Sequence, residues 1–141
     1  MPDQRVTNQL RQQVGERAKG CCEYCLSQVR FSPQAFSVEH IHPRSLGGVT
    51  HLDNLALSCA GCNGHKYNKT QAPDPINNEM VSLFHPRQQI WTEHFSWNEH
   101  YTLIIGLTPT GRATVEALQL NRSALQNLRA VLYLVGQHPS Q

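Results

Sequence analysis

The sequence predicts an α+β fold in which a strand, a long loop, a second strand and a helix form the centre of one domain, residues 1–141. Two observations carry this prediction: short runs of strand-forming residues alternate with segments of helical periodicity, and two Cys-x-x-Cys pairs enclose the central unit. The length of 141 residues suits a single hydrophobic core, and a content of 39% hydrophobic and 16% charged residues is that of a folded protein.

The first expected element is an N-terminal helix over residues 5–19. Its apolar positions, which recur at every fourth residue and so share one helical face, are Val6, Leu10, Val14 and Ala18. Gly20 is expected to end this helix. Residues 21–33 follow neither the helical nor the strand period, and we expect a loop that needs something other than packing to hold it.

The central unit comprises two short strands, one helix and the loop between the strands. Residues 35–40 alternate in polarity and predict a strand, and residues 55–58 predict a second one. The loop of residues 41–53 holds a proline and a Gly-Gly pair, and a helix is expected over residues 60–68. Residues 71–79 contain two prolines and two asparagines, which predicts a linker or long turn without a regular element.

The C-terminal extension, residues 73–141, is expected to form a β-hairpin followed by two helices. Trp91, Phe95 and Trp97 fall on one side of an alternating run, and a second run places Tyr101, Leu103, Ile105 and Leu107 on one side. The Thr108-Pro109 pair predicts a helix start. A last helix has its apolar stripe at Leu125, Leu128, Leu132 and Val135.

The overall polarity of the chain argues against a membrane protein. The longest apolar run, residues 130–135, is far shorter than the roughly 18 residues of a membrane-spanning helix. The first ten residues are too polar for a secretory signal, and we expect a cytoplasmic protein. A net charge of +2 at pH 7 does not by itself indicate a nucleic-acid-binding protein, and Arg112, Arg122 and Arg129 are interpreted as surface charge.

Four cysteines predict a structural metal site. Cys22 and Cys25 are separated by two residues, as are Cys59 and Cys62. Two such turns brought together place four thiolates at the corners of a tetrahedron, the arrangement that zinc prefers. We expect one zinc ion per chain, with strand and loop residues between the pairs forming a functional insertion.

Two other uses of these cysteines are weighed against the zinc site. A reducing cytoplasm disfavours two disulfides, and the duplicated spacing disfavours four unrelated buried thiols. Cys21 lies one residue too far from Cys25 for the tight turn. It is therefore interpreted as a free thiol.

A second pattern lies between the two cysteine pairs. It consists of Glu39-His40, the Gly47-Gly48 loop, Asn54 fourteen positions after the histidine, and Asn63 nine positions after that. This pattern, EHIHPRSLGG followed by NLALSCAGCN, resembles the HNH endonucleases, members of the ββα-metal or His-Me finger group, in their zinc-bearing branch. The motif core covers residues 22–70, and the resemblance implies the strand, loop, strand and helix order of that group.

The resemblance implies a catalytic role for each motif residue. His40 is the general base that takes a proton from water, and Glu39 and Asn63 are oxygen ligands of a catalytic Mg²⁺ or Mn²⁺ ion. Asn54 ties the long loop to itself and holds His40 in position. Glutamate in place of aspartate and asparagine in place of the third histidine favour magnesium or manganese over nickel or zinc at the catalytic centre.

The implied function is metal-dependent endonuclease activity on DNA, double-stranded DNA being the expected substrate of a monomer or homodimer. Arg44, Lys66 and Lys69 lie close to the motif and are candidates for phosphate contacts, although solvated surface charge is an equal contender. Two alternatives remain open. One is a zinc-binding module that grips nucleic acid or protein without catalysis, and the other is an RNA-cutting enzyme of the same fold.

Overall fold

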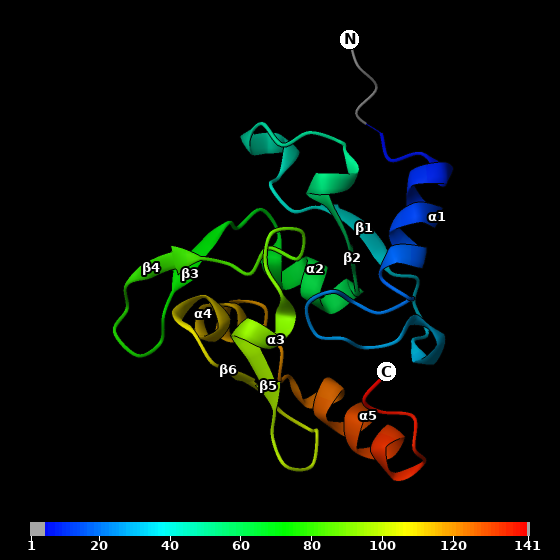
Figure 1. Ribbon diagram of the computed structural model, residues 1–141, viewed down its shortest axis with the longest axis vertical. Helices are drawn as coiled ribbons and strands as arrows, with labels where there is room; N and C mark the ends of the chain where they lie inside the picture. Colours follow the sequence, from blue (N-terminus) through cyan, green and yellow to red (C-terminus); the bar gives the residue numbers. More distant parts are fainter. Residues whose placement is uncertain (1–4, 141) are drawn as a thin grey trace.

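The computed structural model describes residues 5–140 of the chain, and over those residues it has the predicted α+β fold. Five α-helices are joined with three two-stranded antiparallel sheets, β1–β2, β3–β4 and β5–β6 (Figure 1). The β1–β2 pair and α2 lie at the centre of the view, with α1 on one side. The sheets and helices of the C-terminal extension lie below and beside them.

The central strand, loop, strand and helix order is confirmed. Strand β1 (Ser37–His40) pairs antiparallel with β2 (Leu55–Ser58), and helix α2 (Ala60–Lys66) follows directly. The register places Glu39 opposite Ala56 and His40 opposite Leu55. Helix α2 ends two residues earlier than expected because Tyr67 adopts a positive φ of 51°.

The N-terminal helix is shorter than its apolar pattern indicates. Helix α1 spans Asn8–Arg17, and the Thr7 side chain caps it by accepting a hydrogen bond from the Leu10 amide. Val14 is fully buried against Leu55 and Leu57 of β2. The Arg17 guanidinium donates to the carbonyl oxygens of Leu52 and Leu55, which fastens the end of α1 to the start of β2.

The expectation of an irregular linker over residues 71–79 is wrong. Strand β3 (Gln71–Pro73) pairs with β4 (Met80–Ser82), and Pro75 and the two asparagines lie in the turn between them. A two-stranded sheet has only edge strands, where Pro73 removes no hydrogen bond that the pair needs. Asp74 accepts a hydrogen bond from the Ile76 amide inside the turn and pairs with Arg112 of a later helix.

The predicted hairpin and two helices are present in the C-terminal extension. Strands β5 (Phe95–Trp97) and β6 (Ile104–Gly106) pair, and helices α4 (Pro109–Ala117) and α5 (Ser123–Leu134) follow. The Thr108 side chain caps α4, as the Thr-Pro pair predicts. Trp91 is an exception, because it lies in the short helix α3 (Trp91–His94) instead of a strand.

The apolar alternation marks the wrong face of β6. Ile104 is 2% exposed, whereas Ile105 is 44% exposed and Leu107 lies on the surface. The buried face is set by helix α4, since a Cβ atom on Gly106 would lie 2.5 Å from the Arg112 backbone nitrogen. The close approach of two backbones therefore decides which residues of β6 point inward.

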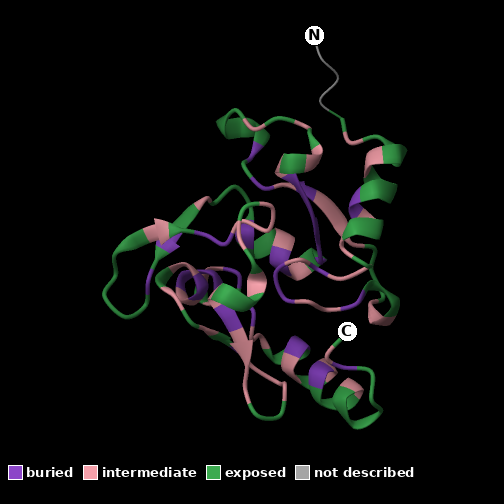
Figure 2. Cartoon of the chain, in the orientation of Figure 1, coloured by how far each residue is buried: buried purple, intermediate pink, exposed green. Residues whose placement is uncertain are grey.

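One hydrophobic cluster joins the central unit to the C-terminal extension. It contains four of the cysteines and Tyr24 together with Phe84, Phe95, Leu118 and Leu120, all of them buried. Buried residues follow β2, α2 and α4 through the middle of the molecule, and exposed residues dominate α1 and the outer loops (Figure 2). Over residues 5–140 no helix is long and apolar enough to cross a bilayer.

The register of β6 is tested by two matched substitutions. We expect Ile104→Ala to lower the free energy of unfolding by about 2–5 kcal/mol, because it opens a cavity in the core. Ile105→Ala removes the same atoms from an exposed side chain and is expected to cost less than about 1 kcal/mol. Urea denaturation of both variants checks this, and equal losses would contradict the register.

Candidate functional site

The sulfur atoms of Cys22, Cys25, Cys59 and Cys62 form a buried cluster. All four lie within 4.8 Å of one another, and the Sγ atoms of Cys25 and Cys59 are 3.7 Å apart. Among residues 5–140 these four side chains form the group whose positions suit a metal ion. Cys25 and Cys59, whose sulfurs are in contact, are 34 positions apart in the sequence. The predicted convergence of the two cysteine pairs is confirmed.

Two local structures present these sulfurs. The first pair lies in a tight turn in which the Leu26 amide donates to the Cys22 carbonyl oxygen. The second pair uses the start of α2, where Cys59 is the N-cap and its sulfur accepts from the Cys62 amide at 3.5 Å. Cys21 stays outside the cluster, with its sulfur directed to the Lys19 carbonyl oxygen.

A positive side chain from the C-terminal extension lies against the sulfurs. The Arg122 guanidinium is 3.3 Å from the Cys59 sulfur and 3.6 Å from the Cys62 sulfur. Burial alone would lower the pKa of Arg122, but the neighbouring Cys62 and Cys59 raise it overall. Arg122 is therefore a permanent cation beside the cluster. Gly61 leaves room for it, since a Cβ atom added at Gly61 would lie 2.3 Å from the guanidinium.

The donor set fits zinc. The four sulfurs are buried together, and four buried thiolates need a cation to balance their charge. Four sulfur ligands with no other donor make a closed site of the structural kind, and N–H donors around the sulfurs are usual partners of such a site. Arg122 supplies such donors here.

Glu39 is buried inside the central unit instead of being open to solvent. Its carboxylate accepts a hydrogen bond from the Tyr24 hydroxyl and lies 3.5 Å from the Lys66 ammonium, with Glu39 7% and Lys66 2% exposed. Burial raises the pKa of Glu39, and the Lys66 charge opposes this shift. Lys66 also donates to the Ile41 carbonyl oxygen, which fixes α2 to the end of β1.

Asn63 lies on the face of α2 that carries Lys66. The two residues are three positions apart, so their side chains neighbour one another on the helix surface. A carboxylate and an amide oxygen are hard donors, and the pair Glu39 and Asn63 fits a magnesium or manganese ion in chemistry. Their role as ligands stays a prediction, since Lys66 already balances the Glu39 charge.

His40 is half-buried at the end of β1. Its Nε2 atom is 2.8 Å from the Thr50 hydroxyl oxygen, which anchors the ring to the long loop. Burial lowers the pKa of His40, and the positive charge of Arg44 lowers it further. The imidazole is therefore neutral at pH 7 and able to accept a proton.

Asn54 closes the long loop on itself. Its side-chain nitrogen donates to the carbonyl oxygens of His42 and Val49, and its oxygen accepts from the His42 amide at 2.8 Å. Gly48 allows this closure, since an added Cβ there would lie 1.8 Å from the His42 carbonyl oxygen. The loop that carries Thr50 is thus held beside His40.

The candidate phosphate-binding cations have different surroundings. Arg44 is exposed and lines a shallow hollow with Gly47 and Gly48, and Lys69 is exposed while donating to the His65 carbonyl oxygen. Lys66 is buried on Glu39, so a contact with DNA is not available from its present position without losing that pair. Direct DNA contact by all three stays a prediction.

The interpretation of three C-terminal arginines as surface charge is wrong. Arg112 pairs with Asp74, Arg122 lies on the sulfurs, and Arg129 is 4% exposed. The Arg129 guanidinium donates to backbone carbonyl oxygens and stacks on the Trp97 ring. Each arginine joins parts of the chain that are distant in sequence.

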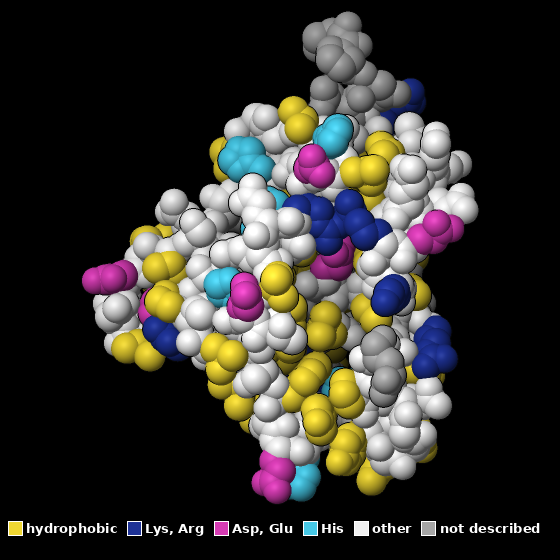
Figure 3. All heavy atoms as spheres, in the orientation of Figure 1, with side chains coloured by type: hydrophobic (Ala, Val, Ile, Leu, Met, Phe, Trp, Pro, Cys, Tyr) yellow, Lys and Arg dark blue, Asp and Glu magenta, His cyan; other side chains and the backbone are white. Residues whose placement is uncertain are grey.

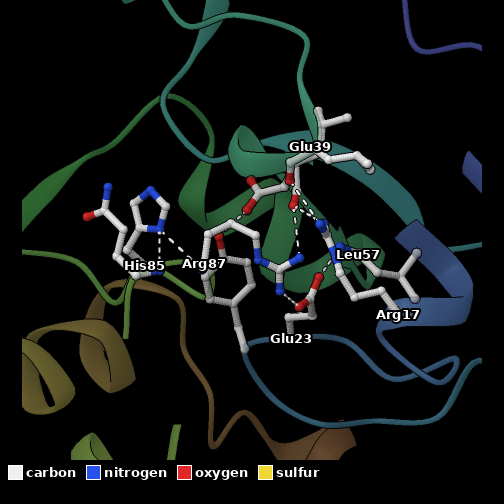
Figure 4. A network of polar contacts seen from close by, with 10 residues as sticks. Arg17, Glu23, Glu39, Leu57, His85 and Arg87 are labelled. Carbon is white, nitrogen blue, oxygen red and sulfur yellow. Dashed lines mark hydrogen bonds and ion pairs between the residues drawn. The ribbon is translucent and has the colours of Figure 1, made fainter. Parts of the chain in front are cut away.

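Four residues of this region belong to no recognisable motif, and their part in the site is seen only in the structure. They are Glu23, Tyr24, His85 and Arg87. Tyr24 bonds to Glu39, and Glu23 pairs with Arg87 and accepts from the Leu57 amide. Figure 4 shows this network, with Arg87 between Glu23 and the ring of His85. Glu23 and Tyr24 stand between the first two zinc-type cysteines, a position that gives no sign of their contacts.

Residues 22–69, 48 of the 141 residues, match the family model described as HNH endonuclease. No curated protein and no solved structure matches the chain significantly. The match includes both cysteine pairs and all four motif residues from Glu39 to Asn63. The recognised HNH resemblance is thereby confirmed for this segment, and the extension beyond residue 69 lies outside the match.

The adjacent cysteines Cys21 and Cys22 allow a matched test of the metal site. We expect Cys22→Ser to lose most of the bound zinc and to lower stability, because it removes one of the four sulfurs. Cys21→Ser is expected to keep about one zinc per chain. Elemental analysis of the purified variants measures this, and zinc loss in both would place the site elsewhere.

Removing Arg122 tests its contact with the sulfurs. We expect Arg122→Ala to lower zinc affinity by roughly 10–100-fold, because the thiolates lose two N–H donors and a neighbouring charge. Competition with a chromogenic chelator measures the affinity, and Arg11→Ala on the exposed surface of α1 is the control. An unchanged affinity in Arg122→Ala would show that this contact does not support the metal.

Proposed function

We propose that this chain is a metal-dependent endonuclease that hydrolyses phosphodiester bonds of double-stranded DNA. The observation that carries the proposal is the arrangement of His40 within the segment that matches the HNH family. The ring is neutral, anchored at Nε2 by Thr50, and set beside a loop that Asn54 closes. DNA is the substrate on which HNH nucleases act.

His40 is the proposed general base. When its Nε2–H donates to the Thr50 hydroxyl, the lone pair of Nδ1 is left to accept a proton from water. The lowered pKa keeps the ring in this neutral form at physiological pH. Arg44 is exposed, and its charge also lowers the pKa of His40, so it is a candidate to attract a phosphate near His40.

Glu39 and Asn63 are the residues that would hold a catalytic Mg²⁺ or Mn²⁺ ion. When bound, such an ion neutralises charge that grows on the phosphate during hydrolysis. Lys66 favours the charged form of the buried Glu39 carboxylate, against the effect of burial, and Tyr24 donates a hydrogen bond to it. The zinc bound by the sulfur cluster has a structural role, because it fixes both ends of the segment that contains Glu39 and Asn63.

A second candidate function is a zinc-binding module that holds nucleic acid without cutting it. The pairing of Glu39 with Lys66 favours this reading, because a carboxylate already balanced by an ammonium has less need of a cation. In a module that only binds nucleic acid, however, the anchored and neutral His40 has no function. The two candidates differ in whether His40 is needed for cutting while binding persists.

Plasmid nicking with Mg²⁺ or Mn²⁺ decides between them. We expect His40→Ala to reduce the cutting rate by about 10²–10⁴-fold, because a general base contributes that much. Zinc content and thermal unfolding should stay those of the wild type, since His40 contacts no sulfur. Agarose electrophoresis of supercoiled DNA gives the rate.

The control for this experiment is His100→Ala, an exposed histidine between β5 and β6. It should cut at the wild-type rate. Equal cutting by wild type and His40→Ala would reject His40 as the base. Absence of cutting by the wild type with both metals on duplex and single-stranded DNA would leave the binding module as the better reading.

A further inference from the structure

A cleft of about 300 Å³ separates the central unit from the C-terminal extension. On one side it is lined by His42, just after β1, and by Lys66 of α2. On the other side it is lined by the segment after β4, including Phe84, His85 and Gln88. One wall thus lies within the HNH match, and the other comes from residues to which no function has been assigned.

The cleft reaches the charged pair inside the central unit. Lys66 lines it although this side chain is 2% exposed, and its ammonium lies between the Ile41 carbonyl oxygen and Glu39. A group that enters the cleft therefore approaches the residues proposed to hold the catalytic ion.

The lining of the cleft suits an anion. It contains two histidines and a lysine with polar threonine, serine and glutamine side chains, and no acidic residue among the described residues that line it. On the face shown in Figure 3, basic side chains gather above the middle with an acidic side chain directly beside them, and hydrophobic side chains lie below, over β5 and α5. A phosphate group meets hydrogen-bond donors and no carboxylate in this lining, because the charge of Lys66 is already paired with Glu39.

The ring of His85 is held in one orientation by its own turn. Its Nδ1 atom accepts from the backbone amides of Arg87 at 3.2 Å and Gln88 at 3.3 Å. The His85 amide in turn donates to the Gln89 side chain. Because Nδ1 is an acceptor, the neutral ring carries its hydrogen on Nε2.

That Nε2–H group has no hydrogen-bond partner among residues 5–140. Figure 4 shows this nitrogen on the side of the ring that faces away from Arg87. His85 is half-buried and lines the cleft, so the donor is preoriented at low entropic cost. Lys66 and Arg87 lie close enough for their charges to lower the pKa of His85, in addition to the larger effect of burial.

We infer that this cleft binds a backbone phosphate of the nucleic acid and that His85 donates its Nε2 hydrogen to a phosphate oxygen. The inference rests on the proposed function and adds a substrate contact from outside the HNH segment. The phosphate enters between His42 and His85, and Lys66 stays paired with Glu39 behind the inner end of the cleft. The C-terminal extension is then one wall of the substrate site as well as part of the core.

Two substitutions of His85 separate a phosphate contact from a structural role. Asparagine keeps an acceptor oxygen near the position of Nδ1, so it preserves the turn but removes the outward donor. Glutamine places an amide N–H near the position of Nε2 and gives up the acceptor of the turn. The matched control is His100→Asn, far from the cleft on the β5–β6 loop.

The binding measurement uses the His40→Ala protein with its zinc, so that DNA is bound and not cut. Fluorescence anisotropy with a fluorescein-labelled duplex gives the dissociation constant. We expect His85→Asn to weaken binding by about tenfold, the size of one hydrogen bond to a charged group. His85→Gln should stay within about threefold of the parent at unchanged salt, and His100→Asn should bind as the parent does.

Three results would overturn the inference. The first is a DNA affinity of His85→Asn equal to that of the parent protein. The second is an equal loss of affinity in both His85 variants together with a lowered melting temperature, which would show that His85 only stabilises its turn. The third is the absence of measurable DNA binding by the His40→Ala protein. Cutting by the wild type is assayed separately, so loss of the endonuclease proposal is distinguishable from loss of the His85 contact.

Discussion

Four buried sulfurs converge where the central unit meets the C-terminal extension, and both parts pack around them. Thiolates packed within 4.8 Å of one another repel unless a cation lies among them. A zinc ion held by the four sulfurs would turn that repulsion into a crosslink between the loop at residues 22–25 and the start of α2. Both ends of the strand, loop and strand segment are then fixed, although each strand has only four residues.

The same crosslink organises the C-terminal extension. Arg122 reaches the sulfurs from the junction of α4 and α5, the Trp91 indole donates to the Tyr24 carbonyl oxygen, and Arg87 pairs with Glu23. All three contacts end within or beside the two cysteine pairs. The extension thereby gains a fixed position from which His85 and Gln88 line the cleft beside Lys66.

The sequence was sufficient for features whose chemistry is local. The paired cysteine spacing predicts the sulfur cluster, and the strand expected at residues 55–58 has those bounds in the structure. Features set by distant contacts were not predictable. The inward face of β6 depends on the approach of α4 to Gly106, and the use of Arg122 depends on sulfurs 60 and 63 positions away. Pro73 was misread because the number of strands in its sheet is a property of the fold, not of the segment.

X-ray absorption at the zinc edge of the purified protein shows whether the four sulfurs hold a metal ion. We expect one zinc per chain with four sulfur neighbours at about 2.3 Å and no nitrogen or oxygen ligand. A shell with nitrogen or oxygen ligands, or protein that folds fully with no metal bound, would contradict it. In that case another interaction must hold the ends of the HNH segment together.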